Sequence, residues 1–134
     1  MKTVVFACVH NAGRSQMAAA FFNALADPAK ARAISAGTRP AKSVHPEVVE
    51  VMREAGVDLS GAVPALLTKE RAQGSALLVT LGCGEECPVL PGVRVEDWPL
   101  EDPKGKAPER VREIRDAIRG RIVRLLQESG WEKS

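Results

Sequence analysis

The chain has 134 residues, of which 45% are hydrophobic and 27% charged, and its formal net charge at pH 7 is +2. These values exclude wholesale disorder and a collagen-like rod, and they predict a single domain over residues 1–134. The first apolar run, Val4 to Val9, is far shorter than the roughly 20 residues of a membrane-spanning helix. The chain has no Tyr, three Phe and two Trp. We therefore expect neither a membrane nor a nucleic acid as a partner.

Three cysteines are present, which is an odd number. No segment resembles a secretory signal, so we expect a cytoplasmic protein. Stable disulfides are rare in that compartment. Three roles therefore remain open for the cysteines: metal ligands, reactive thiols and apolar fillers of the core.

The spacing of apolar residues predicts alternating strands and helices. In chain order, these are a strand at 3–8, a helix at 15–25, a strand at 31–36, a helix at 46–55, a short helix at 66–72, a strand at 76–81, a short strand around 93–95 and a long helix at 108–127. Such alternation is typical of βαβ units with right-handed crossovers. The predicted fold class is α/β, with a four-stranded parallel sheet in a three-layer α/β/α arrangement. Ligands of such sheets bind at the carboxyl ends of the strands.

The loop between the first strand and the first helix predicts an oxyanion site. Cys8 ends the strand, and Arg14 opens the helix after five intervening residues. A tight loop at a helix N-terminus gathers backbone N–H groups into one concavity, where the helix dipole adds positive charge. The residues expected to bind the oxyanion are Val9, His10, Asn11, Ala12, Gly13, Arg14 and Ser15.

The side chains of this loop predict a nucleophilic thiol. Arg14 offers a planar fork that can hold two oxygens of the anion. The positive surroundings favour the thiolate of Cys8, and the Ser15 hydroxyl can donate to it. Gly13 permits a positive φ, and Asn11 tolerates one. The competing interpretation is a buried free cysteine that lies near an arginine by chance.

The segment Cys-Val-His-Asn-Ala-Gly-Arg-Ser-Gln-Met-Ala at 8–18 resembles the opening of the arsenate reductases built on the low-molecular-weight protein tyrosine phosphatase fold. Further segments match at 35–37, 79–81 and 98–103. The resemblance implies the low-molecular-weight phosphatase-like fold, reduction of arsenate to arsenite and no bound cofactor. Phosphate would act as an analogue of arsenate, and the protein would be a monomer.

The resemblance also implies a relay of three cysteines. After Cys8 attacks arsenate, Cys83 would form a disulfide with Cys8, and Cys87 would then form one with Cys83. Thioredoxin would reduce the last disulfide as the external reductant. Glutathione with glutaredoxin, or another small thiol, remains an alternative reductant. Gly82 and Gly84 predict a mobile stretch around Cys83.

Two other interpretations of the second and third cysteines stay open. With a histidine, the Cys-x3-Cys pair could form part of a zinc site, but no second cysteine pair exists, so we expect no metal. The pair could also be a bystander in a low-molecular-weight protein tyrosine phosphatase or a related phosphomonoesterase. Some side phosphatase activity is expected in either case, because phosphate and arsenate share shape and charge.

Two carboxylates are candidates for the general acid, Asp97 and Asp102. Alignment with the family places the acid immediately before Pro103, which favours Asp102. Lys104 follows, where phosphatases that accept phosphotyrosine usually carry an aromatic residue. The absence of that aromatic wall favours a small inorganic oxyanion as the substrate.

Overall fold

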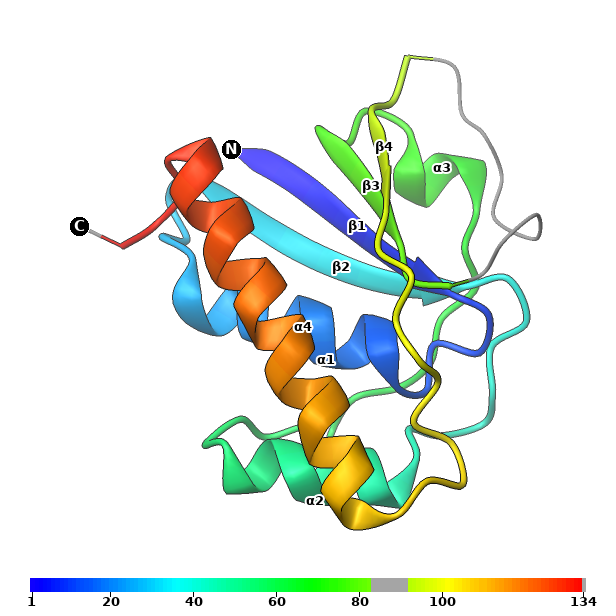
Figure 1. Cartoon of the computed structure of the whole chain (residues 1–134). Coiled ribbons are helices and arrows are strands. Elements are labelled where there is room, and N and C mark those ends of the chain that lie inside the picture. Colours follow the sequence, from blue (N-terminus) through cyan, green and yellow to red (C-terminus); the bar gives the residue numbers. More distant parts are fainter. Residues whose placement is uncertain (83–91, 134) are drawn as a thin grey trace.

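The structure is a computed structural model that describes residues 1–82 and 92–133 (Figure 1). The predictions for Cys83, Gly84 and Cys87 fall outside the described residues. In chain order, the elements are β1 (Lys2–Cys8), α1 (Arg14–Leu25), β2 (Ala31–Gly37), α2 (Pro46–Glu54), α3 (Lys69–Ala72), β3 (Leu77–Thr80), β4 (Val95–Asp97) and α4 (Pro108–Ser129).

The four strands form one parallel sheet in the order β2-β1-β3-β4. This arrangement confirms the predicted α/β fold with a four-stranded parallel sheet. Because the strands are parallel, their carboxyl ends lie along one edge. Cys8 pairs with Gly37 at that edge, and Thr80 pairs with Asp97 there. The loops that follow β1, β3 and β4 therefore begin side by side at this edge.

Alternate residues of β1 enter two separate apolar clusters. Val4 and Phe6 belong to the larger one, which α1 and α4 cover, with α2 packed against α4 (Figure 1). Val5 and Ala7 belong to the smaller one, which includes Ala72 of α3 on the opposite face. Since side chains of a strand point alternately to the two faces, both faces of this apolar strand must be covered. This pattern explains the three layers.

The long helix α4 buries one stripe and exposes the other, as its spacing predicts. The buried stripe contains Val111, Ile114, Ile118, Ile122 and Leu125. On the polar side, Arg112 and Arg115 form ion pairs with Glu54 of α2. The arginine-rich face thus joins α4 to its neighbour. None of the helices described has both the length and the apolar character needed to cross a bilayer.

The short third helix begins later than predicted, at Lys69 instead of residue 66. The hydroxyl of Thr68 accepts a hydrogen bond from the Arg71 N–H at 3.1 Å, so Thr68 caps the helix. A capping threonine has extended backbone and marks the boundary of a helix.

Candidate active site

The loop from Cys8 to Ser15, here called the oxyanion loop, is held by its carbonyl groups. The outside donors are Thr38 N to Cys8 O, Arg39 N to Val9 O, Ala41 N to His10 O, Gln16 Nε2 to Asn11 O and His45 N to Ala12 O. In a planar trans peptide, the N–H points opposite to the C=O. The N–H groups of residues 9–13 therefore face away from these partners, toward the inside of the loop. Such a row of N–H groups binds anions.

Two residues of the oxyanion loop have backbone conformations that can be compared with the prediction. Asn11 has a φ of 51°, as its tolerance of the left-handed region allows. Gly13 permits a positive φ but does not adopt one, because its φ is −142°. Glycine is required there for space, since a Cβ would lie 2.9 Å from Cγ of Pro103.

Gly37, at the end of β2, supports the oxyanion loop. It lies in a segment that resembles the family, but the sequence alone did not indicate its role. A Cβ on Gly37 would lie 2.6 Å from the carbonyl oxygen of Val9 and 2.8 Å from the Asn11 nitrogen. Only glycine lets β2 approach the oxyanion loop this closely. The contact keeps the loop pressed against the sheet edge.

Cys8 lies at the end of β1 and is 2% exposed. Its Sγ is 2.8 Å from Oγ of Ser15, as the predicted contact requires. Asn11 Nδ2 donates to the same Ser15 oxygen at 2.7 Å. Either atom can donate in the Cys8–Ser15 contact, but a thiolate has no proton, so the Ser15 hydroxyl is the donor when Cys8 is ionised. A donor at this distance stabilises a thiolate.

Arg14 connects the oxyanion loop to the segment from Trp98 to Lys106, here called the acid loop. Its Nη1 donates to the Leu100 carbonyl at 3.0 Å, and its Nη2 is 3.8 Å from Oδ2 of Asp102. Gly82, with a φ of 82°, borders the guanidinium so closely that a Cβ there would overlap Nη1. A guanidinium carries five N–H donors, so these contacts leave donors for an oxyanion.

The two candidate acids have different surroundings. The Asp102 side chain is 45% exposed, faces Arg14 and accepts the Lys104 N–H at 3.0 Å. Asp97 accepts the Thr80 hydroxyl at 2.7 Å, which ties it to the neighbouring strand. Of the two, Asp102 is the one that contacts a residue of the oxyanion loop, and it remains the predicted acid.

Other candidate residues have supporting positions. Trp98 is buried in the core against Phe6, with ring centroids 5.8 Å apart. His10 is half-buried, and its carbonyl anchors the loop. Among residues 1–82 and 92–133, no three His, Cys, Asp or Glu side chains converge to hold a metal ion.

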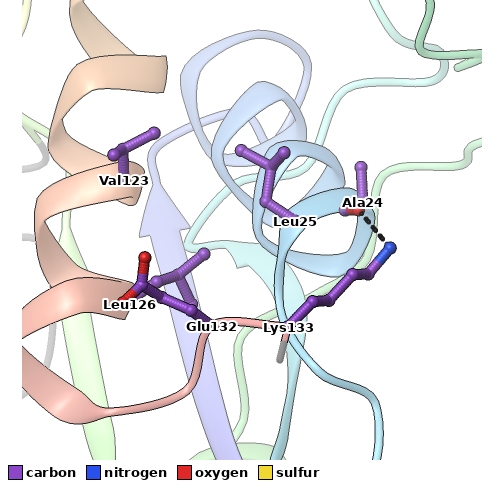
Figure 2. A pocket seen from close by; sticks show the side chains of 6 residues that line it. All are labelled: Ala24, Leu25, Val123, Leu126, Glu132 and Lys133. Carbon is purple, nitrogen blue, oxygen red and sulfur yellow. Dashed lines mark hydrogen bonds between the residues drawn. The ribbon is translucent and has the colours of Figure 1, made fainter.

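A pocket of about 340 Å³ lies at the other end of α1 (Figure 2). It is lined by Ala24, Leu25, Val123, Leu126, Glu132 and Lys133. α1 runs from Arg14 in the site to Leu25 in this pocket. The pocket is therefore separated from Cys8 by the length of the helix, and it brings none of the candidate residues together.

Comparisons with known proteins show which family has a similar sequence. Residues 3–133 match the family described as low molecular weight phosphotyrosine protein phosphatase. A protein of Halobacterium salinarum that is provisionally named an arsenate reductase is 43% identical over 129 residues, covering 92% of this chain and 89% of its own. The glutaredoxin arsenate reductase of Synechocystis is 34% identical over 129 residues, covering 94% of this chain and 97% of its own.

A solved structure shows the same fold. The thioredoxin-dependent arsenate reductase of Corynebacterium glutamicum superposes with a TM-score of 0.82 at 40% identity, over 96% of this chain. This chain spans 61% of the length of that protein.

The chain belongs to the low molecular weight phosphotyrosine protein phosphatase family. Within that family it falls with the arsenate reductases, as the resemblance at residues 8–18 predicted.

Proposed function

We propose that this protein reduces arsenate to arsenite with Cys8 as the nucleophile. The observation that carries the proposal is the 2.8 Å contact of the Cys8 sulfur with the Ser15 hydroxyl, at the base of a loop whose N–H groups face inward. The arsenate reductase names of relatives at 43% and 34% identity support the choice of substrate.

In the first step, the Cys8 thiolate attacks the arsenic atom. A sulfur–arsenic bond forms, and one arsenic–oxygen bond breaks. The departing oxygen is the hydroxyl of the arsenate dianion, which already carries one proton, and Asp102 gives it a second so that it leaves as water. Arg14 and the inward N–H groups hold the other oxygens and stabilise their negative charge.

In the second step, Cys83 attacks the sulfur of Cys8. A disulfide forms, the sulfur–arsenic bond breaks, and its electron pair stays on arsenic, so arsenic(V) becomes arsenic(III). Cys87 then attacks Cys83 and frees Cys8. Gly82, the residue before Cys83, lies against Arg14. The roles of Cys83 and Cys87 rest on the family resemblance.

The external reductant that we propose is thioredoxin, which gives two electrons to the Cys83–Cys87 disulfide. The Corynebacterium glutamicum protein is described as thioredoxin-dependent, and the Synechocystis protein is named for glutaredoxin. The same turnover assay, run once with thioredoxin and its reductase and once with glutathione and glutaredoxin, separates these reductants.

A single-turnover experiment tests the proposal. The fully reduced protein is freed of reductant, given arsenate, blocked with an alkylating agent and mapped by peptide mass. We expect stoichiometric arsenite and a Cys83–Cys87 disulfide in the wild type. The Cys87→Ser variant should stop at Cys8–Cys83, and Cys8→Ser should give no arsenite. Three free thiols without arsenite would exclude the reductase.

A phosphomonoesterase is the second candidate function, and the family description favours it. The site alone does not separate the two, because phosphate and arsenate have the same shape. The rate with an aryl phosphate, compared with the rate of arsenite formation, decides between them. A Cys83→Ser variant should lose arsenate turnover and keep any aryl phosphatase activity.

A further inference from the structure

We infer that Gln16 is a positioning residue that orients the Asn11 amide and thereby directs the Ser15 proton to Cys8. The inference rests on the proposed role of Cys8 as the nucleophile. Gln16 follows Ser15 in α1, and its side chain turns back into the oxyanion loop. Its hydrogen bonds go to Asn11 and Val63, not to the thiol.

Gln16 donates through one nitrogen to two oxygens of the same residue. Its Nε2 is 3.1 Å from the backbone oxygen of Asn11 and 3.1 Å from Asn11 Oδ1. A third oxygen, that of Val63, lies at 3.5 Å. All three neighbours are acceptors, so the amide of Gln16 must present its NH₂ group to them.

The orientation of Asn11 follows from its donors. Oδ1 accepts from Gln16 and also from the backbone N–H of Ala65 at 2.9 Å. Nδ2 is therefore the end that faces Ser15, and the Ser15 oxygen must accept from it. The single hydroxyl proton of Ser15 is then available to the Cys8 sulfur.

Because the residues of this hydrogen-bond network are buried, the network is sensitive to a change of Gln16. Asn11 and Ser15 are 0% exposed, and Gln16 is 6% exposed. No buried side-chain N or O atom among the described residues lacks a hydrogen-bond partner. An unpaired polar group is costly in such a buried network. The Gln16 contact with the Asn11 carbonyl also holds a residue whose φ is 51°.

The direct test changes the donor into an acceptor with Gln16→Glu. A carboxylate at this position repels both Asn11 oxygens, and the Asn11 amide should turn over. Its Oδ1 would then accept the Ser15 proton, and Cys8 would lose its donor. Gln16→Met keeps the length of the side chain and removes the donor without adding charge, so a smaller effect is expected because Ala65 still binds Oδ1.

The readout is the pH dependence of iodoacetamide alkylation of Cys8, measured in a Cys83→Ser/Cys87→Ser background so that one thiol reacts. We expect the midpoint to rise by about one pH unit in Gln16→Glu, which is a roughly tenfold lower thiolate fraction below the midpoint. Gln16→Met should rise by less, and Gln127→Glu, an exposed position on α4, should match the parent. Thermal unfolding reports any loss of stability separately.

A double-mutant cycle with Ser15→Ala identifies the route of the effect. If Gln16 acts through Ser15, neither Gln16 variant shifts the midpoint further once Ser15 is alanine. Equal shifts with and without Ser15 would show a direct charge effect and overturn the inference, as would unchanged midpoints in both single variants. Because alkylation needs no arsenate, failure of arsenate turnover would count against the proposed function alone.

Discussion

The ring of Pro103 lies directly over Gly13, where a Cβ would stand 2.9 Å from the proline Cγ. This contact joins the acid loop to the N-terminus of α1, next to the oxyanion loop residues. Asp102 immediately precedes the proline, so the position of this proposed acid depends on the absence of a side chain at residue 13.

Gly13→Ala should therefore displace Pro103 and move Asp102 away from the substrate. Displacement of a catalytic group by about 1 Å can cost on the order of 100-fold in rate. We expect kcat for arsenate to fall by about 10- to 100-fold, with phosphate inhibition changed less. Gly61→Ala, at a glycine with open space around it, is the matched control. Adding Pro103→Ala should restore part of the rate, and a fully active Gly13→Ala enzyme would contradict this account.

Asp102→Asn should slow the first chemical step and leave arsenate binding nearly unchanged. A general acid contributes roughly 100- to 10,000-fold to a rate, and asparagine has no proton to give. Single-turnover rates at saturating arsenate measure the step. Asp97→Asn serves as the comparison, because its partner is Thr80. A larger loss in Asp97→Asn would show that the acid has been assigned to the wrong carboxylate.

Gly82→Ala should weaken oxyanion binding by about tenfold, the effect of disturbing a charged hydrogen bond. Its Cβ would overlap Nη1 of Arg14 and push the guanidinium aside. Gly74→Ala is a matched control because its φ of 79° is almost equal to the 82° of Gly82 and its surroundings are open. Both variants should lose similar stability from left-handed alanine. Competitive inhibition by phosphate should change in Gly82→Ala alone.

The acid loop is tied to α4 by Glu101, whose carboxylate receives two hydrogen bonds from Arg110 at 2.8 and 3.0 Å. The hydrogen bond from Arg110 lowers the pKa of Glu101 below its usual 4.5. A carboxyl group whose pKa is lowered by folding stabilises the fold fully above its unfolded-state pKa. That stabilisation is lost as the pH falls through the lower, folded-state pKa.

We therefore expect Glu101→Gln to lower the Tm slightly at pH 7, because exposed ion pairs are weak. The difference from wild type should begin to close as the pH falls below about 4.5, and it should vanish below the lower folded-state pKa, where the wild-type carboxylate is also neutral. Glu70→Gln, exposed on α3, is the control. Thermal unfolding between pH 3 and pH 7 measures both, and a difference that widens toward acid pH would contradict the prediction.

The sequence was sufficient for the elements of the fold because their signals are local. The apolar run at 76–81 predicted β3, and the spacing of Val111, Ile114 and Ile118 predicted α4. Alternation of strands and helices leads to a parallel sheet, and the spacing from Cys8 to Arg14 marked the oxyanion loop. These features depend on residues close together in the chain, so hydrophobic periodicity and loop length determine them.

The tertiary structure alone decided how the loop is held and oriented. Four of the donors to its carbonyls come from residues 38–45, and Gly13 is required by Pro103, which lies 90 residues away in the chain. The amide of Asn11 is oriented partly by Ala65. Contacts of this kind join segments that are distant in sequence, and no local pattern contains them. The physical reason is that hydrogen-bond direction and close approach depend on where the folded chain places each partner, whereas strand and helix formation depend on nearby residues.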